Sequence, residues 1–173
     1  ALSSHEVAQG YKEVEEYSAF VRFPVAGEKD TYLLAWTTTP WRLPSNVALC
    51  VNEKEEYSRF RLGGDTFIMA SELIPSLFSE ADRGEMQVLG RFPGSKLLGT
   101  EYIPLWPLVK PIEKAFYVVG DSYVTLTDGT GIVHIAPAFG EDDARIGREN
   151  NLPFVQLVDP QGSFVRDTPW AGV

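Results

Sequence analysis

Short apolar segments that end at proline or glycine constrain the fold of this chain more than any other feature. Its 173 residues include 15 glycines and 12 prolines, and the apolar segments between them have the length of strands, about three to ten residues. Because only two helices are expected, at 72–78 and 141–151, the sequence predicts a strand-dominated α+β fold, a small β-barrel core with peripheral helices. The strands are predicted at 14–23, 31–38, 47–51, 57–62, 66–69, 86–92, 115–120, 123–126, 132–136, 154–158 and 163–165.

Glycine, serine and proline also predict how these segments are joined. Gly63-Gly64 predicts a two-residue hairpin between its flanking strands. Ser71 stands where it can cap the short helix that follows. Pro40 and Pro44 exclude a regular strand, so we expect an extended loop around them.

Length and composition indicate a single soluble domain. Hydrophobic residues make up 44% of the chain and charged residues 23%, which is ordinary for a globular protein. Residues 1–173 are interpreted as one domain, with connecting segments at 1–10 and about 166–173. No apolar run reaches the ~20 residues of a membrane span, and no secretory pattern is found. We therefore expect a cytoplasmic protein with no membrane partner, monomeric as an isolated domain.

The counts of cysteine, histidine and charged residues argue against a metal site and against long-range attraction to nucleic acid. Cys50 is the only cysteine, and the two histidines, His5 and His134, lie far apart in the chain, so we expect no metal and no cofactor in this domain. The net charge is −9. Long-range attraction to a nucleic acid is therefore absent, and any contact with one must be local.

Two polar stretches interrupt the apolar pattern. One runs over residues 36–46 and contains three successive threonines. The other, residues 129–143, is predicted to form a tight turn, a strand with one histidine, a proline stop and the acidic start of a helix. Ends of strands that lead into loops often hold polar groups over a cleft. We therefore expect the two stretches to form facing walls of one site.

Two common chemistries are not favoured at this site. Gly129-Thr130-Gly131 lacks the third glycine or lysine of nucleotide loops and precedes a strand, so it is interpreted as a hairpin turn. No serine lies in a Gly-x-Ser-x-Gly turn, so a serine triad is not indicated. What remains is a cleft of hydroxyls, one imidazole and carboxylates.

Each candidate side chain also has an ordinary structural explanation. The threonines at 37–39 can finish a strand, since β-branched residues favour strands. Asn46 can bond its own backbone, and His134 can be a core histidine with a satisfied hydrogen bond. Asp142 and Asp143 can stabilise the first turn of a helix. Taken one at a time, these residues do not decide between structure and function.

Taken together, in order, the residues form two motifs. They are Trp36-Thr37-Thr38-Thr39-Pro40-Trp41-x-Leu43-Pro44-Ser45-Asn46 and Gly129-Thr130-Gly131-x-Val133-His134-x-Ala136-Pro137-x-x-Gly140-x-Asp142-Asp143. Over the whole chain, this pattern resembles the editing domain of isoleucyl-tRNA synthetase, the first connective peptide inserted into the catalytic domain of that class I enzyme. His134 separates it from the similar valyl enzymes, which usually have lysine there. Arg42 departs from the family, which usually has threonine, so no role is carried over to it.

The resemblance implies an editing activity. A synthetase discriminates only weakly against an amino acid that is one methylene smaller, so a second site that hydrolyses the smaller product is needed. The implied substrate is valine esterified to the 3′ end of tRNA(Ile), with valyl-adenylate as a further candidate. Such an ester is already activated. Oriented hydroxyls and a positioned water then suffice, without a covalent nucleophile.

The resemblance also implies roles for the matching residues. The implied catalytic residues are Thr37, Thr38, Thr39 and Asp143. The three threonines would line the pocket, bind the terminal adenosine and position the water. Asp143 would accept the α-ammonium group of the substrate. His134 would border the amino-acid side chain and help to exclude isoleucine. The other implied substrate-binding positions are Trp36, Asn46, Ala136, Pro137 and Asp142.

The implied partners are the 3′ end of tRNA(Ile) and the rest of the parent synthetase. Because the net charge of the domain disfavours tRNA, the rest of the enzyme would hold the tRNA and deliver only its end. Two alternatives remain open from the sequence. One is a freestanding trans-editing deacylase, and the other is a non-catalytic small-barrel module that binds nucleic acid or protein.

Overall fold

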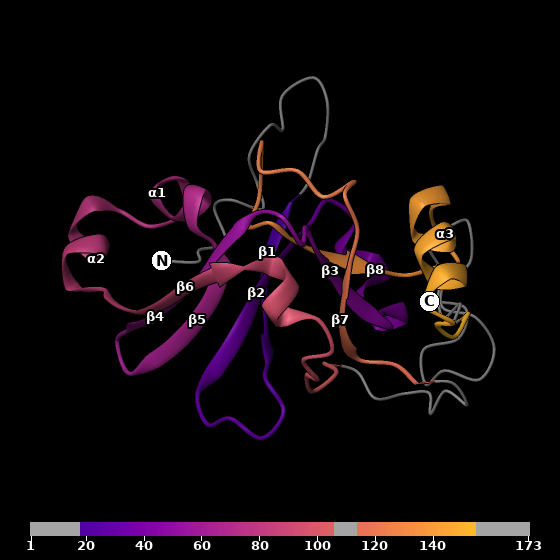
Figure 1. Cartoon of the computed structure of the whole chain (residues 1–173), viewed down its shortest axis with the longest axis horizontal. Coiled ribbons are helices and arrows are strands. Elements are labelled where there is room, and N and C mark those ends of the chain that lie inside the picture. Colours follow the sequence, from indigo (N-terminus) through magenta and orange to yellow (C-terminus); the bar gives the residue numbers. More distant parts are fainter. Residues whose placement is uncertain (1–17, 106–113, 155–173) are drawn as a thin grey trace.

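The computed structural model describes residues 18–105 and 114–154 (Figure 1). Within these ranges, the strands are β1 (Ala19–Pro24), β2 (Thr31–Thr37), β3 (Ala48–Val51), β4 (Glu56–Leu62), β5 (Asp65–Ala70), β6 (Gln87–Pro93), β7 (Tyr117–Gly120) and β8 (Ile132–Ile135). The α-helices are α1 (Ile74–Leu77), α2 (Glu80–Glu85) and α3 (Glu141–Glu149). Short 3-10 helices are formed by Pro40–Ser45, Ser71–Leu73 and Gly94–Leu97.

The strands form one mixed sheet curved into a half-barrel. Its order is β6-β4-β5-β2-β8-β3-β7, and β1 pairs with β2 beside this path. β2 is the central strand, because it pairs with β1 along its length, with β5 over residues 31–33, and with β8 where Trp36 meets Val133. The predicted strand-dominated α+β class, with a small barrel core and peripheral helices, is confirmed.

Two hydrophobic clusters hold the sheet together. The larger cluster includes Phe23, Leu33, Phe60 and Ile68, all almost completely buried, beneath β1, β2, β4 and β5. The smaller cluster joins β3, β7 and β8 to α3 and includes Ile135 and Ile146. In Figure 1, α1 and α2 lie at the end of the sheet near β4 and β6, whereas α3 lies at the opposite end beyond β8. The helices are therefore peripheral, as predicted.

Most predicted elements are confirmed, with ends that differ by one or two residues. They include the strands at 31–38, 47–51, 86–92, 115–120 and 132–136 and the helix at 141–151. The Gly63-Gly64 hairpin is confirmed by the antiparallel pairing of β4 with β5. The strand predicted at 14–23 is seen from Ala19. The start of that strand, the hairpin predicted within 154–165 and both connecting segments lie outside the described residues.

The extended loop predicted around the two prolines is wrong. Residues Pro40–Ser45 form a 3-10 helix, in which the Arg42 amide donates to the Thr39 carbonyl at 2.9 Å. Proline at the first position is compatible with a helix because its fixed φ suits the turn and its missing N–H is not needed there. This turn directs the chain back toward the sheet.

Two further local predictions are wrong, and one helix was not predicted. The Ser71 hydroxyl lies 2.6 Å from that of Ser58 and does not cap a helix, so α1 starts without a side-chain cap. The missed helix α2 has the serine cap instead, because Ser79 accepts from the Asp82 amide at 3.1 Å. Residues 123–126 form no strand. There the Tyr123 amide donates to the Asp121 carboxylate at 2.9 Å, which closes a turn.

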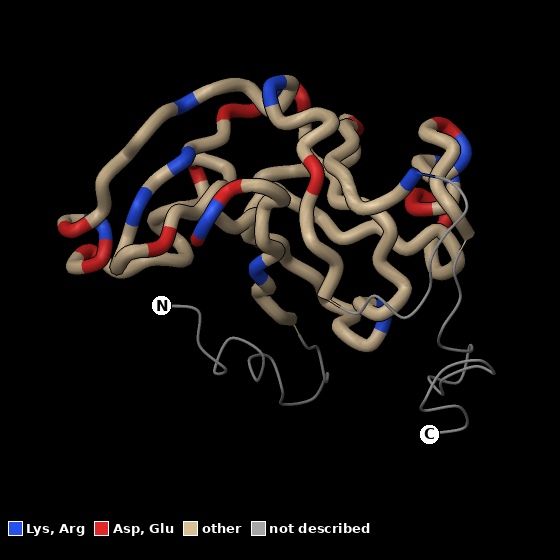
Figure 2. Tube along the Cα trace, turned by 90° about the horizontal axis from the view of Figure 1, so that it is seen from below, with Lys and Arg blue, Asp and Glu red and all other residues tan. Residues whose placement is uncertain are grey.

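Positive and negative side chains are mixed along the described part of the chain. Figure 2 shows Lys and Arg interspersed with Asp and Glu along the chain, without a continuous basic stretch. This agrees with the net charge of −9. In the described part of the chain, no helix has the length and apolar character needed to cross a membrane.

Candidate functional site

A cavity of about 230 Å³ lies where the carboxyl ends of β2 and β8 approach the start of α3. Because β2 and β8 are parallel neighbours, both lead into loops at the same edge of the sheet. The two polar stretches singled out in the sequence therefore do face each other. The lining residues are Trp36, Thr37, Thr38, Thr39, Arg42, Tyr123, Val133, His134 and Asp143.

The threonine segment is organised by its first hydroxyl. Thr37 Oγ1 accepts a hydrogen bond from the Thr39 amide at 3.0 Å and lies 3.4 Å from Thr39 Oγ1. Thr37 is buried at the end of β2, whereas Thr38 is exposed. The ordinary explanation, that these threonines finish a strand, is thus correct for Thr37. Thr38 and Thr39 lie beyond the strand in the cavity wall.

Trp36 is held in place by the glycine turn that precedes β8. Gly129 has a φ of +77°, and a side chain there would meet the Trp36 ring at 2.7 Å. Only glycine therefore allows the turn to pack directly against the indole. The segment predicted to be a hairpin turn is a turn, and it also supports one wall of the cavity. A second depression of about 220 Å³ adjoins it and shares Trp36, Tyr123 and Val133.

His134 is fixed by a buried chain of hydrogen bonds. The Asn46 side-chain amide donates to the Ala48 carbonyl and to His134 Nδ1, both at 2.8 Å, and Asn46 Oδ1 accepts from the Tyr102 hydroxyl. Nδ1 must therefore be the acceptor of the ring, so the proton of the neutral imidazole is on Nε2. Burial, with the nearby Arg42 charge, lowers the pKa of His134 from 6.5 to about 3. The ring is thus neutral at physiological pH.

Asp143 connects α3 to the loop that follows β8. Its Oδ2 accepts from the Ala136 amide at 2.9 Å. Burial raises the pKa of Asp143, while the Ala136 amide and the Arg42 charge act in the opposite direction. Asp143 thus ties the loop after β8 to the first turn of α3, and it also lines the cavity. Its proposed contact with a substrate ammonium group stays a prediction.

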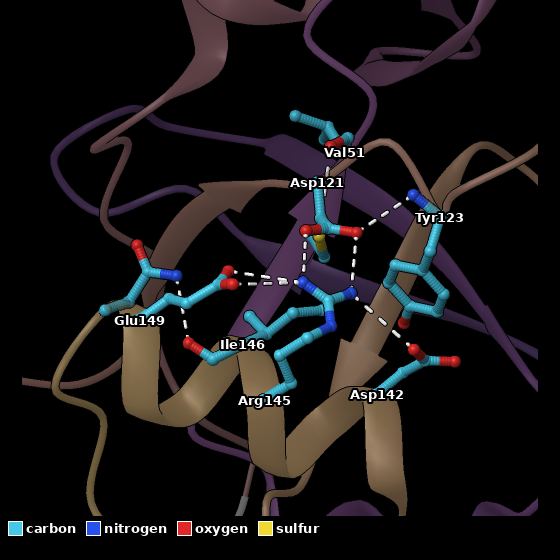
Figure 3. Close-up of polar contacts among 9 residues, drawn as sticks. Val51, Asp121, Tyr123, Asp142, Arg145, Ile146 and Glu149 are labelled. Atoms are coloured by element: carbon cyan, nitrogen blue, oxygen red, sulfur yellow. Dashed lines mark hydrogen bonds and ion pairs between the residues drawn. The ribbon is translucent and has the colours of Figure 1, made fainter.

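An ion-pair network positions α3 and, with it, Asp143. Arg145 donates to both oxygens of Asp121 at 2.9 Å, and it also contacts Glu149 at 3.2 Å and Asp142 at 3.5 Å. Figure 3 shows the guanidinium between the Asp121 carboxylate and the helix. Because Tyr123 lies two residues after Asp121, one network places cavity residues from both the β7–β8 connection and α3.

Arg42 is a cavity residue for which the sequence predicted no role. It lies in the 3-10 helix after the threonines, and its Nη1 donates to the Phe139 carbonyl at 2.8 Å. Its guanidinium carbon is 5.3 Å from the centre of the Phe139 ring. Arg42 therefore connects the two motif stretches across one end of the cavity. Its position inside the first motif could have indicated that it lies at the site, but no role was assigned to it because the family usually has threonine there.

Three unpartnered polar atoms mark the cavity. Arg42 Nε, Tyr123 Oη and His134 Nε2 are the buried side-chain nitrogen and oxygen atoms without a hydrogen-bond partner in the described residues. All three belong to residues that line this one cavity. Leaving a buried polar group unpaired costs about 1–3 kcal/mol, so each such group in a native structure needs an explanation, such as a bound water, ion or ligand. Their convergence indicates a site for a polar ligand.

The remaining predicted residues lie around the cavity and do not line it. Asn46 is buried behind His134, and Ala136 is buried with its amide on Asp143. The Asp142 side chain is 60% exposed and points to Arg145. Pro137 lines another depression, of about 520 Å³, beside α3. Their proposed substrate contacts therefore stay predictions, whereas Tyr123, placed in a predicted strand, was missed.

Comparison with known proteins finds strong similarity to one enzyme family. The chain is 53% identical, over 174 aligned residues and its whole length, to isoleucine–tRNA ligase of Clostridium novyi, and 46% identical over 173 residues to that of Picrophilus torridus. It spans only 16% of the length of these relatives. No protein-family model matches the chain.

Solved structures show a shared fold. The domain described as GlLeuRS-CP1 has a TM-score of 0.62 at 18% identity, covering 76% of this chain and 59% of that one. The editing domain of P. knowlesi cytosolic leucyl-tRNA synthetase also has a TM-score of 0.62, at 14% identity, covering 78% of this chain and 63% of its own. The chain therefore belongs to the isoleucine–tRNA ligase family, as one segment of such an enzyme, and it has the fold of a synthetase editing domain.

Proposed function

We propose that this domain hydrolyses the ester of valine with tRNA(Ile), as the editing domain of an isoleucyl-tRNA synthetase. One observation supports this best: a small cavity combines the Asp143 carboxylate with hydroxyls of the threonine segment at the ends of two parallel strands. A carboxylate next to hydroxyls suits an α-amino ester, which presents one cation and several oxygen atoms. Cofactors are not required for this reaction.

Asp143 is the proposed anchor of the substrate ammonium group. The carboxylate is half-buried, so a charge-assisted hydrogen bond to an ammonium is screened less than at the surface. His134, though close by, does not repel this cation, because its low pKa keeps the ring neutral. The cavity thus has one anion for the one cation of the ester.

Water is the proposed nucleophile. No described lining residue is a serine, cysteine or lysine, and an aminoacyl ester is activated enough to react with oriented water. Thr38 and Thr39 lie beyond the end of β2 in the cavity wall, where their hydroxyls can position that water and the terminal ribose. Valyl-adenylate, a mixed anhydride of the same amino acid, is a further candidate substrate.

His134 is the proposed limit on side-chain size. The ring cannot rotate freely, because Nδ1 is bonded to Asn46 and Asn46 is in turn bonded to Tyr102. A fixed wall can exclude a larger side chain, whereas a mobile one would adapt. Substitution His134→Ala in the synthetase is therefore expected to permit hydrolysis of Ile-tRNA(Ile). If Ile-tRNA(Ile) stays intact while Val-tRNA(Ile) is still hydrolysed, this role is contradicted and His134 is only structural.

The tRNA is expected to be held mainly by the rest of the enzyme. The domain has a net charge of −9 and interspersed charges, which do not favour a polyanion. The proposed partners are accordingly the 3′ end of tRNA(Ile) and the parent synthetase, acting in the cytoplasm. We expect the isolated chain to bind tRNA weakly at physiological salt. Tight binding would favour a freestanding deacylase instead.

The test is an aspartate exchange in the synthetase that contains this chain. Asp143→Asn retains an oxygen for the Ala136 amide but removes the charge. Hydrolysis of Val-tRNA(Ile) is expected to fall by about 10²-fold or more, because the loss of one partner of a buried charged pair costs about 2–5 kcal/mol. Glu141→Gln, an exposed acid in the first turn of the same helix, is the matched control and should change the rate little. Equal rates for both variants would refute the proposal.

A further inference from the structure

Arg42 is an unpaired cation in the cavity wall. One of its nitrogens, Nη1, is used by the Phe139 carbonyl, and its Nε is buried without a partner. It forms no ion pair with any carboxylate among the described residues, whereas Arg145 on α3 contacts three. A partly buried charge without a counter-ion is costly. Arg42 is therefore arranged to receive an anion from a ligand.

The position of Arg42 relative to Asp143 limits what that anion can be. Both residues line the same cavity of about 230 Å³, yet they form no ion pair with each other. Asp143 provides a site for a cation and Arg42 a site for an anion in the wall of one small cavity. A ligand with both charges on one carbon, an α-amino acid, matches this arrangement.

We propose that Arg42 binds the carboxyl end of the amino acid: its Nε–H donates to the ester carbonyl oxygen as that oxygen gains negative charge, and afterwards to the carboxylate of the released amino acid. For the ester, this inference rests on the proposed function. For the free amino acid, it does not.

The reaction makes clear why a fixed cation is useful here. Water adds to the ester carbonyl carbon, and the carbonyl π electrons move to oxygen, which becomes negative. The bond from carbon to the ribose oxygen then breaks, the ribose oxygen takes a proton that came from the water, and the product acid releases its remaining proton to solvent. Because Arg42 is held by Phe139 before substrate arrives, its N–H group needs no reorganisation. A preorganised donor of this kind stabilises the transition state.

Ligand binding tests the inference independently of catalysis. NMR titration of the 173-residue chain with L-valine and with L-valinol compares the same side chain and ammonium with and without a carboxylate. We expect valine to bind more tightly than valinol, and we expect Arg42→Met to remove this difference. Arg61→Met, an exposed arginine on β4, is the control and should retain it. Equal binding of both ligands by the unmodified chain would overturn the inference.

A phosphate of the tRNA is the competing anion. Titration with adenosine 5′-monophosphate and with adenosine tests it in the same variants. If Arg42→Met removes a preference for the monophosphate and leaves the preference for valine over valinol, Arg42 binds a phosphate and the inference is wrong.

Kinetics in the parent synthetase then test the catalytic part. Arg42→Met is expected to lower kcat for hydrolysis of Val-tRNA(Ile) about 10²-fold with little change in KM, as loss of one oxyanion donor does. Arg42→Lys should restore part of the rate, since it keeps the charge but not the planar donor. An unchanged kcat in Arg42→Met overturns the catalytic part. If the unmodified enzyme does not hydrolyse the ester, the proposed function fails, and the comparison of valine with valinol still decides whether Arg42 binds a carboxylate.

Discussion

The two ends of the sheet differ in how their buried polar groups are paired. Beneath β4 and β5, the Tyr57 hydroxyl donates to the Gly131 carbonyl at 2.6 Å and accepts from the Asn52 amide at 2.9 Å, and Ser58 pairs with Ser71. Around the cavity near α3, three buried polar atoms have no partner in the described residues. The first region therefore contributes stability, whereas the second retains unpaired groups that a ligand can satisfy.

Two arginines show the same difference at close range. Arg145 holds α3 in place through paired contacts with Asp121 and Glu149, and it does not line the cavity. Arg42 lies in the lining with an unpaired nitrogen. The two cations thus differ in their partners and not in their residue type.

The largest expected effect is on stability. Phe60 is completely buried in the larger cluster, so Phe60→Ala should lower the free energy of unfolding by about 3–5 kcal/mol, from lost burial and the cavity left behind. Urea unfolding followed by tryptophan fluorescence measures this change. The folded fraction should keep its preference for valine over valinol, because Phe60 does not line the cavity.

A matched substitution in the other region sharpens the comparison. Ile146 is completely buried beneath α3, and Ile146→Ala should cost about 2–5 kcal/mol. In this variant, valine binding should weaken as well, since α3 positions Asp143. If both alanine variants affect binding equally, the two regions are not functionally distinct. If either alanine variant does not fold, Phe60→Leu and Ile146→Val replace them, because they remove fewer buried atoms at the same positions.

A smaller effect is expected from loosening α3. Arg145→Met removes the bidentate contact with Asp121, so Asp143 and Tyr123 should lose part of their alignment. Hydrolysis of Val-tRNA(Ile) by the synthetase should fall about 10-fold, because small displacements in a site lower rates strongly. Arg148→Met on the same helix is the control, since Arg148 is exposed and forms no ion pair with a described residue. Equal rates in both variants would show that the network is not needed for alignment.

The last expected effect is on the dependence of stability on pH. His134 has a folded pKa of about 3, below its ordinary 6.5, so the folded state binds its proton less readily than the unfolded state. Its stabilising contribution is complete above pH 6.5 and is lost as the pH falls toward 3. His134→Gln should therefore show a shallower loss of unfolding free energy in this interval.

The control for this measurement removes the Asp143 carboxyl group, whose effect on stability changes with pH in the opposite direction. Asp143 has a raised pKa, so its stability contribution is present at low pH and is lost as the pH rises. The comparison is therefore repeated with Asp143→Asn in both proteins. Identical slopes with and without His134 in that background would mean that the imidazole is not held neutral.

Much of the fold could be predicted from local pattern. The strands around Leu33, Leu49 and Val133 were recognisable because apolar, β-branched segments end at glycine or proline, and Gly63-Gly64 specified its hairpin. The 3-10 helix at Pro40–Ser45 was not recognisable, because proline is compatible both with an extended loop and with the first turn of a helix. Tyr123 was placed in a strand, since its turn depends on a hydrogen bond to Asp121.

The sequence by itself determined the class of the fold, the two motif stretches and the candidate site residues within them. Only the tertiary structure decided which of these residues share a cavity. Parallel pairing of β2 with β8 brings Thr37 near His134, although they lie far apart in the chain. The tertiary structure also decided which arginine forms ion pairs with carboxylates, since ion pairs depend on distances between segments that are remote in sequence. Local sequence pattern predicts which strand, turn or helix a residue belongs to, whereas tertiary packing decides which side chains it contacts.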